Sequence, residues 1–247
     1  MTLSVIPVPG IPLVQPGDDL AGLIAIAMAD AGIALADGDV VVVAQKVVSK
    51  AEGRTVRLSE VAVTPEAGAL AATSGKSPAV AALILDEAQA VMRAVPNVIV
   101  VRNRLGHVLA NAGIDASNVA GDETVLLWPI DPDASARAIR ARLGGDIAVI
   151  VSDSLGRAWR MGTMGTAIGC AGIRPVRDRC GETDLFGRVL QSTRIGVADE
   201  IAAAASLVIG EAAEAIPVAI VRGAAYDRDE DAGVSMLLRP AAEDLFP

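Results

Sequence analysis

Four short apolar runs, rich in β-branched residues, constrain this chain more than any other feature of its sequence. They lie at residues 40–44, 98–102, 147–152 and 218–221, and polar residues or glycine bound them. Continuous apolar runs of this length are typical of strands that are buried on both faces of a sheet. We therefore expect all four to be buried strands.

Segments with helical composition lie between and around these runs. They cover residues 18–34, 79–94, 131–141 and 199–213. Asp18 is expected to cap the first helix, Pro96 follows the second, and Gly144-Gly145 ends the third. Because helices and strands mix without a strict βαβ order, we predict a mixed α+β fold that is not of the Rossmann type. Residues 1–247 are expected to form one unit, and the one candidate for a sub-domain boundary lies near residue 152.

Composition limits the classes of function. Hydrophobic residues make up 52% of the chain but aromatic residues only 2%, which argues against a base-stacking surface. The formal net charge of -9 argues against a broad nucleic-acid surface, which needs clustered Lys and Arg. No stretch approaches the roughly eighteen consecutive apolar residues of a membrane helix, and the first residues lack the basic segment of a secretion signal. We expect a cytoplasmic protein that binds neither nucleic acid nor membranes.

Few side chains are available to bind soft metals. His107 is the single histidine, and Cys170 and Cys180 are the two cysteines, which is too few for the common zinc sites. A bound metal would therefore be Mg²⁺ or Mn²⁺, held by carboxylate, hydroxyl and carbonyl oxygens. We expect His107 to be a packed or capping residue.

Gly75-Lys76-Ser77 looks like the end of a phosphate-binding loop, but the rest of that motif is missing. The motif requires a glycine five positions before its second glycine, and Leu70 stands there. We therefore expect no Walker loop.

The polar segment at residues 111–118 places a carboxylate, a hydroxyl and two amides close together. Asp115 in such a loop could bind a metal ion. The same residues are also typical of a turn in which Asp and Asn bond to the local backbone. From the residues alone, the turn is the favoured interpretation.

A second candidate site follows the apolar run at 147–152. Asp153 and Ser154 offer two adjacent oxygens, as Mg²⁺ sites often do, and Arg157 and Arg160 could bind a carboxylate or phosphate. The alternative is a helix cap at Asp153 with solvated arginines, and the residues do not decide between the two. Glycines then recur through residues 162–172, which indicates backbone packed closely against a ligand or another part of the chain.

Several segments, taken in order, carry a resemblance to a known family. They are Ile-Pro-Leu-Val at 11–14, Gly-Asp-Asp-Leu at 17–20, the segment 45–54, the segment 110–118, Ser-Asp-Ser-Leu-Gly-Arg at 152–157, Ala-Ile-Gly at 167–169, Val-Ala-Asp-Glu at 197–200, and 239–246. In this order they resemble the coenzyme F-420 γ-glutamyl ligases, which add glutamate to the side chain of a deazaflavin cofactor. The resemblance covers nearly the whole chain and favours a functional role for Asp115.

The resemblance implies a GTP-dependent ligase that uses Mg²⁺ or Mn²⁺, joins L-glutamate to the deazaflavin substrate and forms an intertwined homodimer. By motif position, the implied metal ligands are Asp115, Asp153, Ser154 and Glu211. The implied guanine-nucleotide site consists of Ile11, Pro12, Leu13, Val14, Gln45, Lys50, Asn118 and, within the segment 209–216, Gly210. The expected catalytic residues are Asp153, Arg157 and Arg160, with the arginines holding the deazaflavin phosphodiester or the incoming glutamate.

The chain departs from the family pattern near these arginines. Ser154 stands where the family usually has Thr, which keeps a hydroxyl, while Leu155 and Ala158 replace Phe and Pro. Residues 163–165, Thr-Met-Gly, replace Gln-Thr-Asp, so the acceptor and the number of added glutamates stay open. The alternatives are a metal-dependent phosphohydrolase, a related ligase with another acceptor, and a non-catalytic binding protein.

Overall fold

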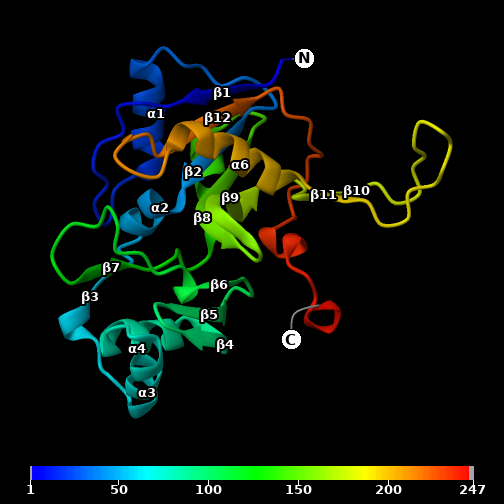
Figure 1. Ribbon diagram of the computed structural model, residues 1–247. Coiled ribbons are helices and arrows are strands. Elements are labelled where there is room, and N and C mark those ends of the chain that lie inside the picture. The colour runs from blue at the N-terminus through cyan, green and yellow to red at the C-terminus, as the bar shows by residue number, and fades with distance from the viewer. Residues whose placement is uncertain (1, 245–247) are drawn as a thin grey trace.

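The computed structural model describes residues 2–244 and has the predicted mixed α+β architecture, which is not a Rossmann fold (Figure 1). Its strands are β1 (Ser4–Pro7), β2 (Val40–Ala44), β3 (Thr55–Arg57), β4 (Ala88–Val95), β5 (Val98–Asn103), β6 (Val108–Ala110), β7 (Thr124–Leu126), β8 (Ala148–Arg157), β9 (Arg160–Ala171), β10 (Val176–Asp178), β11 (Arg194–Gly196) and β12 (Val218–Arg222). Its α-helices are α1 (Leu20–Asp30), α2 (Gln45–Ala51), α3 (Pro65–Ser74), α4 (Pro78–Asp86), α5 (Pro132–Leu143) and α6 (Val197–Ile209). The last two residues of the family-like segment 239–246 lie outside the described residues.

A five-stranded sheet in the order β1-β12-β2-β8-β9 forms the centre of the molecule. Only β2 and β8 are parallel neighbours, and the other pairs are antiparallel. Val41 and Val43 of β2 belong to the core that includes α1 and α5, whereas Val40 and Val42 belong to the core that includes α6. Because side chains alternate along a strand, helices on both faces require a continuous apolar run. Three of the four predicted strands, now β2, β8 and β12, are confirmed in this sheet.

A smaller layer contains α3, α4 and the sheet β4-β5-β6, and lies below the central sheet in Figure 1. The predicted strand at residues 98–102 is confirmed as β5 of this layer. The prediction of one helix over residues 79–94 is wrong in its second half, because α4 ends at Asp86 and β4 follows. Asn97 adopts a left-handed conformation with φ 70° in the turn after β4, and β4 then pairs with β5 from Val95 and Val98 onward. Cross-strand pairing here outweighs local helical composition.

The helix ends partly follow the predicted caps. Asp19, not Asp18, caps α1 by accepting a hydrogen bond from the backbone of the first turn. The predicted ends of α5 are confirmed, with Asp131 as the N-cap and Gly144 as the C-cap. Helix α6 ends at Ile209, so the predicted helix over residues 199–213 is wrong at its C-terminal end. The C-cap Gly210 has a φ of 73°, which departs from helical geometry, and the residues after it lie in a loop.

The glycine-rich strand β9 packs against two helices. A Cβ atom at Gly165 would overlap the backbone of Ala202 in α6, and one at Gly169 would overlap the backbone of Pro132 in α5. The predicted close packing is therefore against other parts of the chain at these two positions. Strand β8 runs unbroken through Asp153 to Arg157, so the alternative of a helix cap at Asp153 is wrong.

Gly75 and Ser77 act as caps between two helices. Gly75 ends α3 in the left-handed conformation, with φ 70°. The Ser77 side chain accepts a hydrogen bond from the backbone of Val80 at the start of α4. This glycine–lysine–serine sequence thus has a local structural role.

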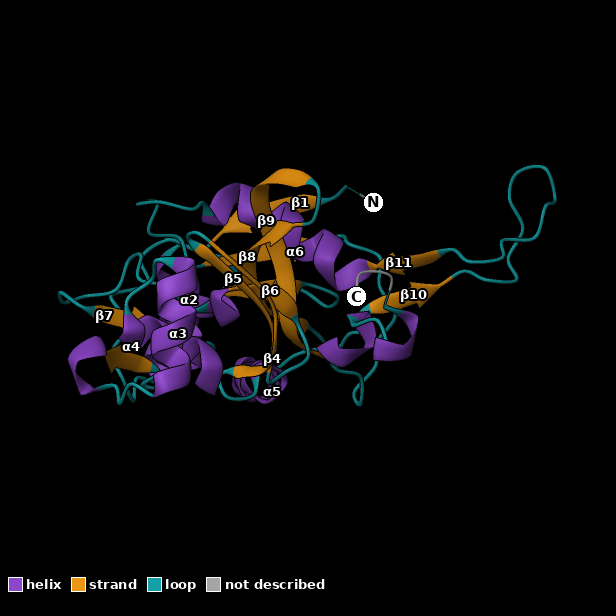
Figure 2. Ribbon diagram, turned by 60° about the horizontal axis from the view of Figure 1, so that its bottom comes forward, coloured by secondary structure: helices purple, strands orange, loops and turns teal. Residues whose placement is uncertain are grey.

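Strands β10 and β11 form the base of a long arm that extends from the body (Figures 1 and 2). Near its tip, the side chain of Leu185 is 100% exposed and that of Phe186 is 84% exposed. The chain therefore presents large apolar side chains to solvent at the end of a projecting segment.

No single helix within residues 2–244 has the length and apolarity needed to cross a membrane. Helices α3 and α4 meet the requirement only when counted together, and they are bent by 113° relative to each other.

Candidate functional site

A cavity of about 290 Å³ lies where the first turn of α2, the middle of β8 and the loop after α6 meet. Most of the predicted site residues line it: Leu13, Val14, Gln45, Lys50, Asn118, Asp153, Ser154, Gly210 and Glu211. The predicted residues outside its wall are Ile11, Pro12, Asp115, Arg157 and Arg160. The structure therefore brings together residues that are separated by nearly two hundred positions in the sequence.

One side of the cavity is built around α2. Gln45 is buried at the start of this helix, and its Nε2 donates a hydrogen bond to Oγ of Ser49 at 2.6 Å. Nζ of Lys50 donates to the carbonyl oxygen of Asn118 at 2.7 Å, and Nδ2 of Asn118 donates to the carbonyl oxygen of Ala212 at 3.1 Å. Asn118 therefore links α2 to the loop after α6.

Of residues 11–14 near the N-terminus, only the last two line the cavity. Val14 is buried against the cavity, and Leu13 lines it while remaining 87% exposed. Ile11 instead packs against the core that includes α1 and α5, and Pro12 is exposed. A direct role for Ile11 and Pro12 in the cavity wall, as the family resemblance implied, is therefore not seen.

Asp153 and Glu211 make another part of the cavity wall acidic. Oδ2 of Asp153 accepts a hydrogen bond from Nε1 of Trp128 at 2.7 Å, and Oδ1 accepts one from the backbone nitrogen of Ser154 at 2.8 Å. Oγ of Ser154 donates to Oε1 of Glu211 at 2.6 Å. Burial is the main cause of the raised pKa of Asp153, and the nearby charge of Asp115 raises it further.

Asp115 lies beside the cavity and forms the turn that its sequence predicted. Its Oδ1 accepts a hydrogen bond from the backbone nitrogen of Ser117 at 2.6 Å. Its Oδ2 also forms an ion pair with Nζ of Lys46 at 2.8 Å. Burial raises the pKa of Asp115, but the hydrogen bonds and charge of these two neighbours outweigh it, so the pKa is lowered.

Lys46 is a site residue that sequence reasoning missed. It lines the cavity, pairs with Asp115 and donates a hydrogen bond to Oγ of Ser117 at 2.6 Å. Its position beside Gln45 in the family-like segment 45–54 was the only available signal.

The predicted metal ligands supply the oxygen donors that Mg²⁺ and Mn²⁺ prefer. Within residues 2–244, no group of three or more His, Cys, Asp and Glu side chains converges closely enough to hold a metal ion. The structure instead shows Ser154 bonded to Glu211, with Asp153 under the electrostatic influence of Asp115. Lys46 provides the positive charge beside Asp115. The donor types therefore suit a hard cation, but in this structure the carboxylates do not converge on one point and Lys46 pairs with one of them.

Arg157 and Arg160 lie at the tip of the β8–β9 hairpin, where they face each other in register. Both are exposed, as is Trp159 between them at 89%. Trp159 has a φ of 63° because it stands in the hairpin turn. The arginines therefore project from the body and do not belong to the cavity wall.

His107 is a packed residue, as predicted. It is 6% exposed, and its ring meets that of Trp128 edge to face, with centroids 5.3 Å apart. Burial lowers its pKa to about 4, so the ring is neutral at pH 7. Trp128 was not predicted as a site residue, because nothing in the sequence relates it to Asp153.

The fold and the cavity define an α+β protein with a cavity that is lined by both lysine ammonium groups and carboxylates. Comparison with known proteins makes this class specific. The chain belongs to the F420-0:Gamma-glutamyl ligase family, whose profile matches residues 10–223. The family expected from the sequence is thereby confirmed.

Three relatives match over most of their length. The coenzyme F420:L-glutamate ligase of Methanothermobacter thermautotrophicus is 47% identical over 251 residues, covering 100% of this chain and 99% of that protein. The protein of the same name from Methanopyrus kandleri is 42% identical over 252 residues, covering 99% and 98%. The one from Archaeoglobus fulgidus is 43% identical over 227 residues, covering 90% and 88%.

Proposed function

We propose that this chain is a coenzyme F420:L-glutamate ligase that uses GTP together with Mg²⁺ or Mn²⁺. Membership of the family and the names of the relatives support the deazaflavin acceptor and L-glutamate as substrates. The observation that carries the proposal is the cavity, because Lys50 lines the same space as Asp153 and Glu211. Nucleotide phosphates and a divalent cation have suitable partners there.

The proposed reaction has two steps. A carboxylate oxygen of the deazaflavin substrate attacks the γ-phosphorus of GTP, the bond from that phosphorus to its bridging oxygen breaks, and GDP leaves. The amine of L-glutamate then attacks the acyl-phosphate carbon, loses a proton and forms the amide bond as phosphate is expelled. Positioning and charge neutralisation supply most of the catalysis in phosphoryl transfer.

Lysines and acidic residues divide this work. Lys50 is proposed to bind the nucleotide phosphates. Burial, and then the charge of Lys46, lowers the pKa of Lys50. The negative charge of bound phosphates would raise this pKa again. Mg²⁺ or Mn²⁺, when bound, would neutralise phosphate charge during the transfer. The proposed ligands are Asp115, Asp153, Ser154 and Glu211.

Arg157 and Arg160 are proposed to bind the anionic groups of the acceptor or of glutamate. Their guanidinium groups can form paired hydrogen bonds with carboxylate or phosphate. Their exposure on the β8–β9 hairpin leaves them accessible to a substrate that is larger than the cavity. Arg160→Ala should therefore raise the KM for one of these two substrates, and an unchanged KM for both would contradict the assignment.

A homodimer is part of the proposal. The apolar tip of the β10–β11 arm, formed by Leu185 and Phe186, is fully or largely exposed in the single chain. Exposed large apolar groups on a projecting segment are typical of a surface that is covered in an assembly. We propose that a second copy of this chain buries this tip in the homodimer.

The test is to incubate the purified protein with the unglutamylated deazaflavin, L-glutamate, GTP and Mn²⁺, and to follow glutamate mass increments. We expect increments that require GTP and that disappear in Asp153→Ala. Loss of GTP without glutamate and without modified deazaflavin would favour a metal-dependent phosphohydrolase. Increments with a different carboxylate acceptor would favour a related ligase.

A further inference from the structure

Trp128 occupies a buried position between the two acidic segments of the site. Its side chain is 2% exposed, and its Nε1 donates a hydrogen bond of 2.7 Å to Oδ2 of Asp153. On the other segment, Gly113 lies so close to the indole that a Cβ atom there would overlap Nε1. The indole therefore contacts both the strand that carries Asp153 and the loop that leads to Asp115.

The backbone next to Trp128 fixes the second carboxylate. Asp115 and Leu126 form an antiparallel bridge, in which the backbone nitrogen of each donates to the carbonyl oxygen of the other at 3.1 and 2.8 Å. Leu126 thus holds the main chain of Asp115, and two residues later Trp128 holds the side chain of Asp153. One short segment, residues 126–128, sets the relative position of both acidic groups.

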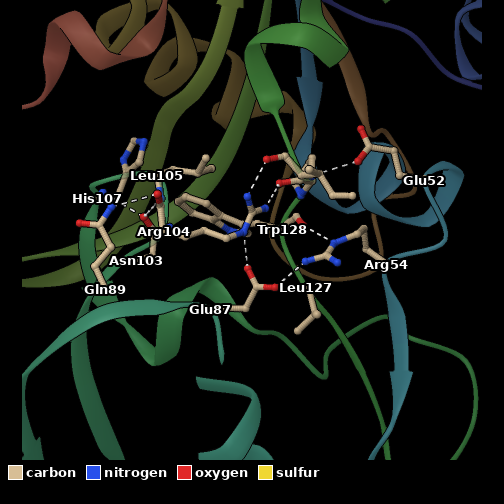
Figure 3. A network of polar contacts seen from close by, with 12 residues as sticks. Glu52, Arg54, Glu87, Gln89, Asn103, Arg104, Leu105, His107, Leu127 and Trp128 are labelled. Carbon is tan, nitrogen blue, oxygen red and sulfur yellow. Dashed lines mark hydrogen bonds and ion pairs between the residues drawn. The ribbon is translucent and has the colours of Figure 1, made fainter. Parts of the chain in front are cut away.

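A polar network holds this segment in place (Figure 3). Nε of Arg54 donates to the carbonyl oxygen of Trp128 at 2.9 Å, and Glu87 bridges Arg54 and Arg104. Arg104 in turn donates to the carbonyl oxygens of Pro129 and Ile130 at 2.8 and 2.7 Å. Several charge-assisted hydrogen bonds to consecutive carbonyls make the segment a rigid support.

We propose that Trp128 is a positioning residue. Its indole N–H fixes the orientation of the Asp153 carboxylate toward the cavity, and its ring sets the distance between the Asp115 loop and Asp153. An indole N–H can only donate, so it occupies one lone pair of Oδ2 and prevents rotation of the carboxylate. The inference rests on the proposed function, since Trp128 would orient Asp153, one of the residues proposed to hold the divalent cation. Partners of this kind orient ligand carboxylates in metal sites.

Trp128→Phe is the decisive variant, because it removes the N–H and keeps an aromatic ring in the core. We expect Mn²⁺ affinity, measured by calorimetry or by the electron paramagnetic resonance signal of free Mn²⁺, to fall about tenfold. Trp159→Phe is the matched control: it makes the same change at an exposed position, and its Mn²⁺ affinity should stay within error of the wild type. Equal Mn²⁺ affinities for Trp128→Phe and the wild type would overturn the inference.

A second measurement does not depend on the folding of Trp128→Phe. In Trp159→Phe, Trp128 is the one remaining tryptophan of the chain, so its fluorescence reports on the site alone. We expect Mn²⁺ to quench this fluorescence, and the quenching to be lost when Asp153→Asn is added. Absence of quenching, or quenching that persists with Asp153→Asn, would overturn the inference. Both readouts are independent of glutamate transfer, so a failure of the ligase assay with intact quenching would count against the proposed reaction alone.

Discussion

At the residue scale, the site depends on pairs of polar groups that restrain one another. Lys46 restrains Asp115 and Glu211 restrains Ser154, and both contacts are shorter than 3 Å. Each contact restricts the side chain of Asp115 or Ser154 to few rotamers before a substrate binds. Less side-chain entropy is then lost when the active geometry forms. Single substitutions within these pairs are therefore expected to affect activity more than stability.

Ser154→Ala should lower kcat/KM for glutamate addition at least about tenfold, equivalent to about 1.4 kcal/mol of transition-state stabilisation. The substitution removes the hydroxyl that bonds to Glu211 and that is proposed to bind the cation. Ser154→Thr keeps this hydroxyl and should retain activity within a few-fold. Similar activity for Ser154→Ala and the wild type would exclude the hydroxyl as a metal ligand.

Asp39 should make the free energy of unfolding depend on pH in the acidic range. Its side chain is 1% exposed and pairs with Arg222 at 2.7 Å. Burial raises the pKa of Asp39, but the hydrogen bond from Arg222 and that from the Ala36 backbone outweigh this effect, so the pKa lies below the ordinary value of 3.8. A lowered folded-state pKa gives stability that is complete above the unfolded pKa and is lost as pH falls through the folded value.

Asp39→Asn should therefore reduce the free energy of unfolding near pH 7 by about 2 kcal/mol, since it removes a buried carboxylate that accepts hydrogen bonds from Arg222 and from the Ala36 backbone. The difference from the wild type should begin to shrink below about pH 4, where Asp39 of the unfolded chain becomes protonated, and should be lost as the pH falls through the lower folded-state pKa. Denaturant titrations at several pH values measure both effects. Asp227→Asn, at a more exposed pair with Arg177, should change stability by no more than about 0.5 kcal/mol. A constant difference at all pH values would contradict the assigned linkage.

At the element scale, the close approach of helices α5 and α6 to strand β9 shapes the body of the protein. Neither helix could pack as it does if β9 carried ordinary side chains at Gly165 and Gly169. Helix α6 delivers Gly210 and Glu211 to the cavity at its C-terminal end. Packing against β9 therefore positions one wall of the site.

Gly169→Ala should destabilise the protein by about 3 kcal/mol, because the added methyl group meets the backbone of Pro132, which cannot rotate away. Gly68→Ala is a matched control within α3, where an added Cβ has no neighbour within 4 Å. This control should stabilise the protein by about 0.5 kcal/mol, since alanine favours a helix over glycine. Chemical denaturation monitored by circular dichroism measures the free energy of unfolding, which should fall in Gly169→Ala and rise in Gly68→Ala. Equal changes in the two variants would contradict this account of β9.

Elements with strong local signals could be predicted from the sequence, and those that depend on distant partners could not. Strand β2 follows from its continuous valines, and α5 follows from Asp131 and Gly144 at its ends. Strand β4 has helical composition, and only its pairing with β5 makes it extended. Gln45 and Asp153, which line the cavity, could be predicted from family-like motifs. Trp128 could not, because its link to Asp153 exists only in the folded chain.

At the scale of the whole molecule, the cavity joins segments from almost the full length of the chain. Leu13, Lys50, Asn118, Asp153 and Glu211 come from five separate segments. Hydrogen bonds link the last four of these segments to one another: Lys50 bonds to Asn118, Asn118 to Ala212, and Ser154 to Glu211. The β10–β11 arm makes no comparable contribution within its own chain and extends away from the body (Figure 1). Its apolar tip is the surface that, in the proposed homodimer, a second copy would cover.

The double variant Leu185→Ser, Phe186→Ser should shift the protein from dimer to monomer at micromolar concentration. Loss of two large apolar side chains from an interface costs about 4 kcal/mol of association free energy, which corresponds to a weakening of roughly a thousandfold. Light scattering coupled to size-exclusion chromatography measures the mass directly. Leu207→Ser, on the exposed face of α6 at 83% exposure, is the control and should leave the mass unchanged. If the wild type is monomeric, or if the double variant stays dimeric, the arm has another role. A monomeric double variant with a normal unfolding midpoint would place the dimer contact at the tip of the arm.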